Sequence, residues 1–266
     1  MKRRVFQIVS VALVNSYLTA PFTKGLCFPV LNCYACPLAA VACPIGSLQH
    51  FSAIHVFPFY VVGVLGMVGI VVGRMTCGWL CPFGFLQDLF FKMHSVKCRL
   101  PQRLNYLKYI LLVALVIAVP YFTGEPWFSK LCPAGVLEAG IPLAMLDEQV
   151  RRQLGGMFWF KIGILSGFLV SFTFIKRPFC RAICPLGAIF SPFNAHSAYR
   201  LEFDEKECIH CDKCYRKCPV DIKVYESPNS ADCIRCLECT DCACIRITNI
   251  LRASEARQKS QTGEAK

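Results

Sequence analysis

The chain has 266 residues and a formal net charge of +12, and 55% of its residues are hydrophobic while only 17% are charged. This composition is typical of a membrane protein and excludes an ordinary soluble domain. The basic residues form no stripe with interleaved aromatic residues, so we expect no nucleic-acid binding.

Four apolar runs divide the first 200 residues, at positions 5–22, 56–73, 106–122 and 158–175. Each is close to the ~20 residues that cross a bilayer as a helix. We therefore predict a mainly α membrane protein, with a bundle of four transmembrane helices over residues 1–200. The first run is expected to remain as an anchor and not to be cleaved as a secretory signal.

Lysine and arginine residues are concentrated before the first run, between the second and third runs, and after the fourth run. The positive-inside rule then predicts that both termini face the cytoplasm. The expected location is the cytoplasmic membrane of a bacterium or archaeon, in contact with membrane lipid.

A Cys-Pro-x-Gly motif occurs four times, beginning at Cys43, Cys81, Cys132 and Cys184. Proline suits the first position of a helix, which makes each cysteine the residue that caps it. The positive end of the helix dipole favours a thiolate there. We therefore predict four thiols of low pKa, each followed by a short re-entrant or interfacial helix, with Cys43 and Cys132 on the outer side of the membrane.

The two repeats on the predicted cytoplasmic side carry a second cysteine, in "CGWLCP" and "CRAICP". Cys77, Cys81, Cys180 and Cys184 could hold a further iron–sulfur cluster or form redox-active dithiols. Alternatively they are small apolar side chains that fill space between helices.

The outer side has its own cysteines: Cys27, Cys33, Cys36, Cys43 and Cys132. The segment that contains most of them is apolar enough to dip back into the membrane, where irregular backbone must be packed in protein. Whether these thiols form a disulfide, bind a metal or stay free is left open by the sequence.

Residues 201–249 are polar and rich in cysteine, and are predicted to form a small cytoplasmic α+β domain of the bacterial two-cluster ferredoxin type. The first run contains Cys208, Cys211, Cys214 and Cys218 followed by Pro219, which is the spacing of a 4Fe–4S ferredoxin. The second run contains Cys233, Cys236 and Cys239. Its fourth ligand is either Cys242, which we favour, or Cys244.

In two-cluster ferredoxins the fourth cysteine of each run binds the cluster of the other run. This predicts two 4Fe–4S clusters, one held by Cys208, Cys211, Cys214 and Cys242 and the other by Cys218, Cys233, Cys236 and Cys239. Disulfides are disfavoured in a reducing compartment, and zinc sites usually contain two separated cysteine pairs. The polar tail, residues 250–266, is predicted to be disordered.

Together, the four spans, the two Cys-x3-Cys-Pro motifs and the terminal cysteine runs resemble the polyferredoxin-type membrane quinol dehydrogenase family, of the NapH type. The resemblance implies electron transfer between quinone or quinol and a partner redox protein or complex subunit, and thus a quinol dehydrogenase subunit. The second cysteine run departs from the family pattern because it lacks the final Cys-Pro. Two alternatives are a copper-handling assembly factor that uses the Cys-x3-Cys-Pro thiols, and a passive membrane anchor of a larger redox complex.

Overall fold

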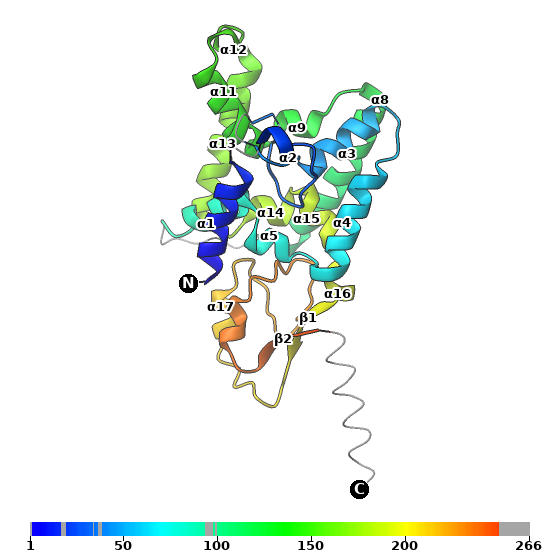
Figure 1. Cartoon of the computed structure of the whole chain (residues 1–266). Helices are drawn as coiled ribbons and strands as arrows, with labels where there is room; N and C mark the ends of the chain where they lie inside the picture. Colours follow the sequence, from blue (N-terminus) through cyan, green and yellow to red (C-terminus); the bar gives the residue numbers. More distant parts are fainter. Residues whose placement is uncertain are drawn as a thin grey trace.

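The structure, a computed structural model, has a helical body with a small C-terminal domain attached to one end (Figure 1). It describes residues 2–16, 20–33, 35–36, 39–93, 98 and 100–249. The predicted disordered tail, 250–266, lies outside the described residues. The N-terminus of the first helix is close to the C-terminal domain, and the α11–α12 turn is at the opposite end of the body.

The first part of the helical body contains α1 (Lys2–Val14), α2 (Ala20–Thr23), α3 (Pro44–Ala53), α4 (Phe59–Val72), α5 (Met75–Trp79) and α6 (Pro82–Phe90). The second part begins with η1 (Gln102–Tyr106), α7 (Leu107–Leu111), η2 (Leu112–Ala118), α8 (Val119–Thr123) and α9 (Trp127–Leu131). It continues through α10 (Pro133–Gly135), η3 (Val136–Gly140), α11 (Ile141–Leu146), α12 (Glu148–Arg152) and α13 (Gly156–Phe174). The last helices of the body are α14 (Pro178–Ala182), α15 (Pro185–Phe190) and α16 (Phe193–His196).

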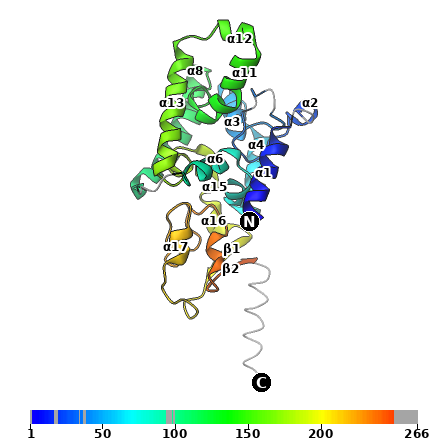
Figure 2. The ribbon, with the colours of Figure 1, turned by 90° about the vertical axis from the view of Figure 1, so that its left-hand side faces the viewer.

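Among the described residues, two helices are long and apolar enough to cross a membrane: Gln102–Thr123, which runs from η1 to α8, and Gly156–Phe174, which is α13. Figure 2 shows α13 running along most of the height of the helical body. The first two predicted spans form shorter helices, since α1 has 13 residues and α4 has 14. Of the first apolar run, residues 17–19 lie outside the described part of the chain.

Large apolar side chains cover the outward faces of several long helices. They include Val5, Phe6 and Leu13 on α1, Phe59, Met67 and Ile70 on α4, Ile110, Val113 and Phe122 between α7 and α8, and Trp159, Phe160 and Val170 on α13. A water-soluble monomer rarely exposes so much apolar surface without a binding partner. This surface therefore fits an apolar environment around the helical body.

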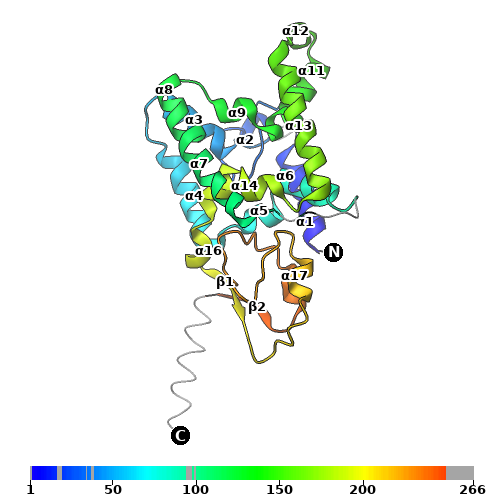
Figure 3. The same cartoon turned by 180° about the vertical axis from the view of Figure 1, so that it is seen from behind.

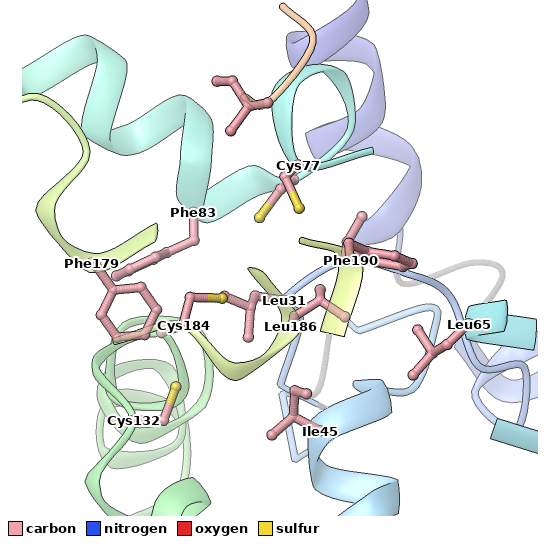
Figure 4. Packing of buried hydrophobic residues seen from close by; sticks show 14 of the residues in the cluster. Leu31, Ile45, Leu65, Cys77, Phe83, Cys132, Phe179, Cys184, Leu186 and Phe190 are labelled. Carbon is pink, nitrogen blue, oxygen red and sulfur yellow. The ribbon is translucent and has the colours of Figure 1, made fainter. Parts of the chain in front are cut away.

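The core of the body packs around the cysteine-bearing helices (Figure 4). Phe83 lies edge-on to Phe172 and Phe179, with ring centroids 5.7 Å and 5.0 Å away. Leu31 also lies in this core and is 2% exposed, because the segment from Cys27 to Ala42 folds inward. Irregular backbone thus packs inside the protein, as a re-entrant segment requires.

The C-terminal domain contains β1 (Tyr199–Phe203), α17 (Lys213–Lys217), η4 (Glu238–Asp241) and β2 (Ile245–Asn249). The two strands pair antiparallel, with Leu201 opposite Ile247. The strand pair and α17 lie on opposite sides of the domain (Figure 3). Leu201 and Ile245 are buried between these two sides, in a cluster that consists mostly of cysteines.

Candidate metal centre

Four cysteines from two different runs line one small cavity in the C-terminal domain: Cys218, Cys233, Cys236 and Cys239. Cys218 is the fourth cysteine of the first run, and it lies beside the three cysteines of the second run. The backbone N–H groups of Ile222 and Arg235 donate to the sulfurs of Cys218 and Cys233, each over 3.4 Å. Such N–H···S bonds tune the potential of a cluster that these residues would hold.

The remaining cysteines of the domain gather beside α17. The thiol of Cys214 lies close to those of Cys208 and Cys242, and Cys244 hydrogen-bonds to Cys208. Cys211 is exposed beside them. Both candidates for the fourth ligand, Cys242 and Cys244, are therefore at the site.

Among the described His, Cys, Asp and Glu side chains, no group of three converges tightly enough to hold a metal ion. The thiols of a cubane surround a four-iron core and stand farther apart than the ligands of a single zinc ion. Each of the two cysteine groups supplies the thiols, in type and number, that a cubane takes.

A second centre lies inside the helical body, where the two Cys-x3-Cys-Pro motifs meet. The thiol of Cys184 lies close to those of Cys77, Cys81 and Cys180. The amide of Gln87 donates to the sulfur of Cys180 at 3.0 Å. All four thiols are buried. The structure thus brings together the four cysteines proposed for a further site.

All four cysteines of the Cys-Pro-x-Gly repeats cap helices as the sequence predicts. Cys43, Cys81, Cys132 and Cys184 have φ between −64° and −70° and ψ between 113° and 123°, with proline next in the helix. The prediction that these thiols have low pKa values is wrong. Burial raises the pKa of Cys81 and Cys184 and raises that of Cys132 to about 12, and the nearby helix amides do not offset it. A bound metal would supply the positive charge that stabilises these thiolates.

Two buried arginines connect the motifs in a crossed arrangement. Arg177, which precedes Cys180, donates to the carbonyl of Cys77 at 3.0 Å. Arg74, which precedes Cys77, donates to the carbonyl of Cys180 at 3.2 Å.

The glycine of each motif leaves room for the guanidinium of the other. A Cβ at Gly84 would lie 3.2 Å from Nη1 of Arg177, and one at Gly187 would lie 2.9 Å from Nη2 of Arg74. These close approaches explain why both Cys-x3-Cys-Pro motifs continue with x-Gly.

The C-terminal domain packs directly on the helix that carries Cys77. A Cβ at Gly78 would lie 2.4 Å from the carbonyl oxygen of Ile234, so only glycine permits this approach. The indole N–H of Trp79 donates to the carbonyl of Arg235 at 3.0 Å. The loop that carries Cys233 and Cys236 is thereby held against the centre in the helical body.

The five cysteines assigned to the outer side do not all gather together. Cys27, Cys33 and Cys132 each lie close to Cys43. Cys36 packs against Ala39 and Ala139, in a small cluster that Cys33 also contacts.

Comparison with known families gives this geometry a context. A 4Fe-4S binding domain family matches residues 54–101, 107–141 and 156–198, which contain both Cys-x3-Cys-Pro motifs. A second 4Fe-4S binding domain family matches residues 201–223, which contain the first ferredoxin cysteine run. The chain belongs to the ferredoxin-type iron–sulfur electron-transfer proteins, of the NapH type.

Two uncharacterized proteins of Methanocaldococcus jannaschii are 33% and 32% identical to the chain. The matches cover 65% and 66% of this chain, and 62% and 71% of the relatives. The ferredoxin-type protein NapH of Haemophilus influenzae is 25% identical over 61% of this chain and 57% of its own length. The chain thus spans less than two thirds of the first of these relatives. No solved structure matches it.

The sequence analysis did not identify the polar groups that position the Cys-x3-Cys-Pro centre in the helical body. Arg74 and Arg177 each stand three residues before the first cysteine of a motif, which makes the repeat Arg-x2-Cys-x3-Cys-Pro-x-Gly. That repeat was visible in the sequence. The contact between Gln87 and Cys180 was not, because it joins two motifs 93 residues apart.

Proposed function

We propose that the chain is an integral membrane protein that transfers electrons between the quinone pool and a partner redox protein. The centres in the C-terminal domain and the helical body support this proposal because the loop that carries Cys233 and Cys236 packs against the helix that carries Cys77. Clusters of the 4Fe–4S type would supply one-electron carriers at these positions.

The membrane part of the proposal rests on four apolar segments. Two are long enough to span a bilayer, and α1 and α4 add outward faces covered by apolar side chains. Tilting, local thinning of the bilayer and snorkelling side chains allow a short helix to span. We place both termini and the C-terminal domain in the cytoplasm because lysine and arginine concentrate at that end.

We assign three clusters. Two lie in the C-terminal domain, with Cys242 as the fourth ligand of the first, and Cys77, Cys81, Cys180 and Cys184 hold the third. Arg177 lies close to the thiols of both Cys180 and Cys236, and therefore between the second and third clusters. Its fixed positive charge would stabilise the negative charge that each thiolate-ligated cluster carries.

The observation that supports quinone binding most directly is a cavity of about 550 Å³ between α1, α6 and the C-terminal domain. Its apolar lining includes Ile8, Phe85 and Leu89, and Cys218 of the second cluster site also lines it. Ligand sites usually combine an apolar cavity with a few polar groups that fix orientation. A quinone ring in this cavity would lie at the membrane boundary beside a cluster ligand.

Polar side chains in the same cavity could bind the two oxygens of a quinone ring. Lys92 lines the cavity and can donate. Lys176 also lines it but already binds the carbonyl of Cys218 and Asp221, and Glu238 supplies a carboxylate that pairs with Arg3. Oxidation of a quinol releases two electrons and two protons. The clusters would accept the electrons one at a time, and the carboxylate or water would accept the protons.

The test uses the full chain, purified anaerobically and placed in lipid vesicles. Reduction of the clusters by menaquinol is followed by the bleaching of their visible absorption. Ile8→Trp should fill the cavity and slow the reduction at least tenfold. Leu13→Trp is the matched control, because Leu13 is also exposed on α1 but does not line the cavity.

Iron content must equal that of the unchanged protein in both variants, so that slower reduction reports access and not cluster loss. If no quinol reduces the unchanged protein while dithionite does, the quinone proposal is wrong. Equal rates in Ile8→Trp and Leu13→Trp would place the quinone elsewhere.

A further inference from the structure

A third group of thiols lies in the helical body, away from the C-terminal domain. Cys43 caps α3 and Cys132 caps α10, in the same backbone conformation as Cys81 and Cys184. Backbone amides of the helix approach each sulfur: those of Ile45 and Gly46 approach Cys43, and those of Ala134 and Gly135 approach Cys132. The local geometry that positions the thiols of the Cys-x3-Cys-Pro centre is thus repeated here.

Two further thiols complete the group. The sulfur of Cys33 lies 3.6 Å from the Cβ position of Gly135, at the start of the helix that Cys132 caps. Its backbone N–H donates to Oε2 of Glu138 at 2.7 Å, which holds the loop against that helix. Cys27 is buried beside Cys43. Cys27, Cys33 and Cys132, from three segments of the chain, therefore each lie near the thiol of Cys43.

Cys36 lies at the edge of this group. Its side chain packs with Ala39 and Ala139 in a small cluster, and Cys33 packs against the same cluster. Cys27 and Cys132 instead belong to the main core, together with Cys77 and Cys81. Cys43 is thus the common neighbour of Cys27, Cys33 and Cys132, and Cys36 adjoins the group through Cys33.

This group is adjacent to the Cys-x3-Cys-Pro centre. The backbone amide of Leu31 approaches the sulfur of Cys81, and the next amide, of Asn32, approaches the sulfur of Cys43. In Figure 4 Leu31 lies beside Cys184, with Cys77 and Cys132 on either side. Two successive backbone amides, joined through Leu31, therefore connect the two groups.

The chemistry of the group favours an iron–sulfur cluster over its alternatives. All the cysteines concerned are free thiols. Four cysteine thiols are the ligand type and number that a cubane takes, as in the two cysteine groups of the ferredoxin domain, where cubane binding is proposed.

We propose that Cys27, Cys33, Cys43 and Cys132 ligate a fourth iron–sulfur cluster, deeper in the helical body than the other three. It would extend the series of centres away from the C-terminal domain, through the successive backbone amides of Leu31 and Asn32. The proposal concerns metal content and does not depend on quinone as the substrate.

The test measures iron and acid-labile sulfide per chain in the full-length protein purified anaerobically. Cys43→Ser and Cys132→Ser should each lose about four irons relative to the unchanged protein. Cys27→Ser should lose iron or convert the cluster to a three-iron form. Cys36→Ser, the matched control, should keep all its iron.

A second measurement, electron paramagnetic resonance, distinguishes loss of the cluster from misfolding of a variant. In the unchanged protein, reduction should show a cluster whose electron paramagnetic resonance signal broadens through coupling to the Cys81 centre, and Cys43→Ser should remove that broadening. Unchanged iron in correctly folded Cys43→Ser and Cys132→Ser would overturn the proposal. So would stoichiometric zinc or copper in place of iron, a disulfide among the four, or loss of iron in Cys36→Ser with retention in Cys27→Ser.

Discussion

Arg177 and Asp88 form a two-point ion pair, with Nε 2.7 Å from Oδ1 and Nη2 2.5 Å from Oδ2. Arg177 precedes α14 and Asp88 lies in α6, so the pair joins the two cysteine motifs. The same guanidinium donates to the carbonyl of Cys77. Arg3 of α1 also contacts Asp88, at 2.5 Å. One carboxylate therefore holds three segments around the centre in the helical body.

We expect Asp88→Asn to lower the free energy of unfolding by roughly 3–5 kcal/mol, because Arg177 would remain buried without its counter-charge. Thermal unfolding in detergent measures the effect. Glu226→Gln is the control, because its ion pair with Lys223 is half-exposed and should contribute little to stability. Equal melting temperatures for Asp88→Asn and the unchanged protein would contradict the role of the pair.

The same carboxylate makes stability depend on pH. Burial alone would raise the pKa of Asp88, but Arg177 and Arg3 outweigh burial and hold that pKa below its ordinary value. Since the folded-state pKa is the lower one, the stabilisation is complete well above the unfolded value of about 3.9 and is lost as the pH falls through the folded-state pKa.

The difference in unfolding free energy between the unchanged protein and Asp88→Asn should therefore be constant above about pH 5 and shrink on acidification. Unfolding curves of both proteins across this range measure it. A difference that grows toward acid pH would mean that the carboxylate is not the stabilising species.

Gly78→Ala should loosen the C-terminal domain from the helical body. The new Cβ would lie 2.4 Å from the carbonyl oxygen of Ile234, and neither backbone can move without breaking the contact between Trp79 and Arg235. We expect faster proteolysis of the connection before β1 and slower electron transfer between the two parts. Gly66→Ala is the control, because a Cβ there meets nothing within 4 Å and alanine favours a helix. Equal proteolysis rates for the two variants would show that the domain contact tolerates the change.

Cys81→Ser and Cys184→Ser should each remove about four irons per chain while the C-terminal clusters remain. The thiols of Cys81 and Cys184 are buried together, so one missing ligand cannot be replaced by water from solvent. Iron analysis measures the loss from the Cys-x3-Cys-Pro centre. The electron paramagnetic resonance signal of the C-terminal clusters measures whether those clusters remain. Full iron content in both variants would assign these thiols to helix packing and not to a cluster.

Sequence spacing predicted much of the candidate site because its logic is local. Proline after cysteine sets the start of a helix, so the caps at Cys43, Cys81, Cys132 and Cys184 formed as expected. The exchange of Cys218 between the two ferredoxin runs also follows the spacing.

The pKa values of the capping thiols could not be predicted from sequence spacing, because they depend on burial. The pKa of a capping thiol combines a local helix dipole with the dielectric of its surroundings, and only packing determines the second. Burial therefore raises the pKa of Cys132, whereas the sequence predicted a lowered pKa. The lengths of α1 and α4 likewise differ from the apolar runs, because the chain turns inward after α1 and breaks before α5.

The sequence by itself determined the class of protein, the ferredoxin cysteine spacing and the four helix caps, since these depend on neighbouring residues. Only the tertiary structure decided that Arg74 and Arg177 cross between motifs and that Leu31 and Asn32 connect two groups of thiols. The physical reason is that these contacts join segments far apart in the chain. Such contacts are set by how the helices pack around the inward-folded loop, and no periodicity or spacing encodes that packing directly.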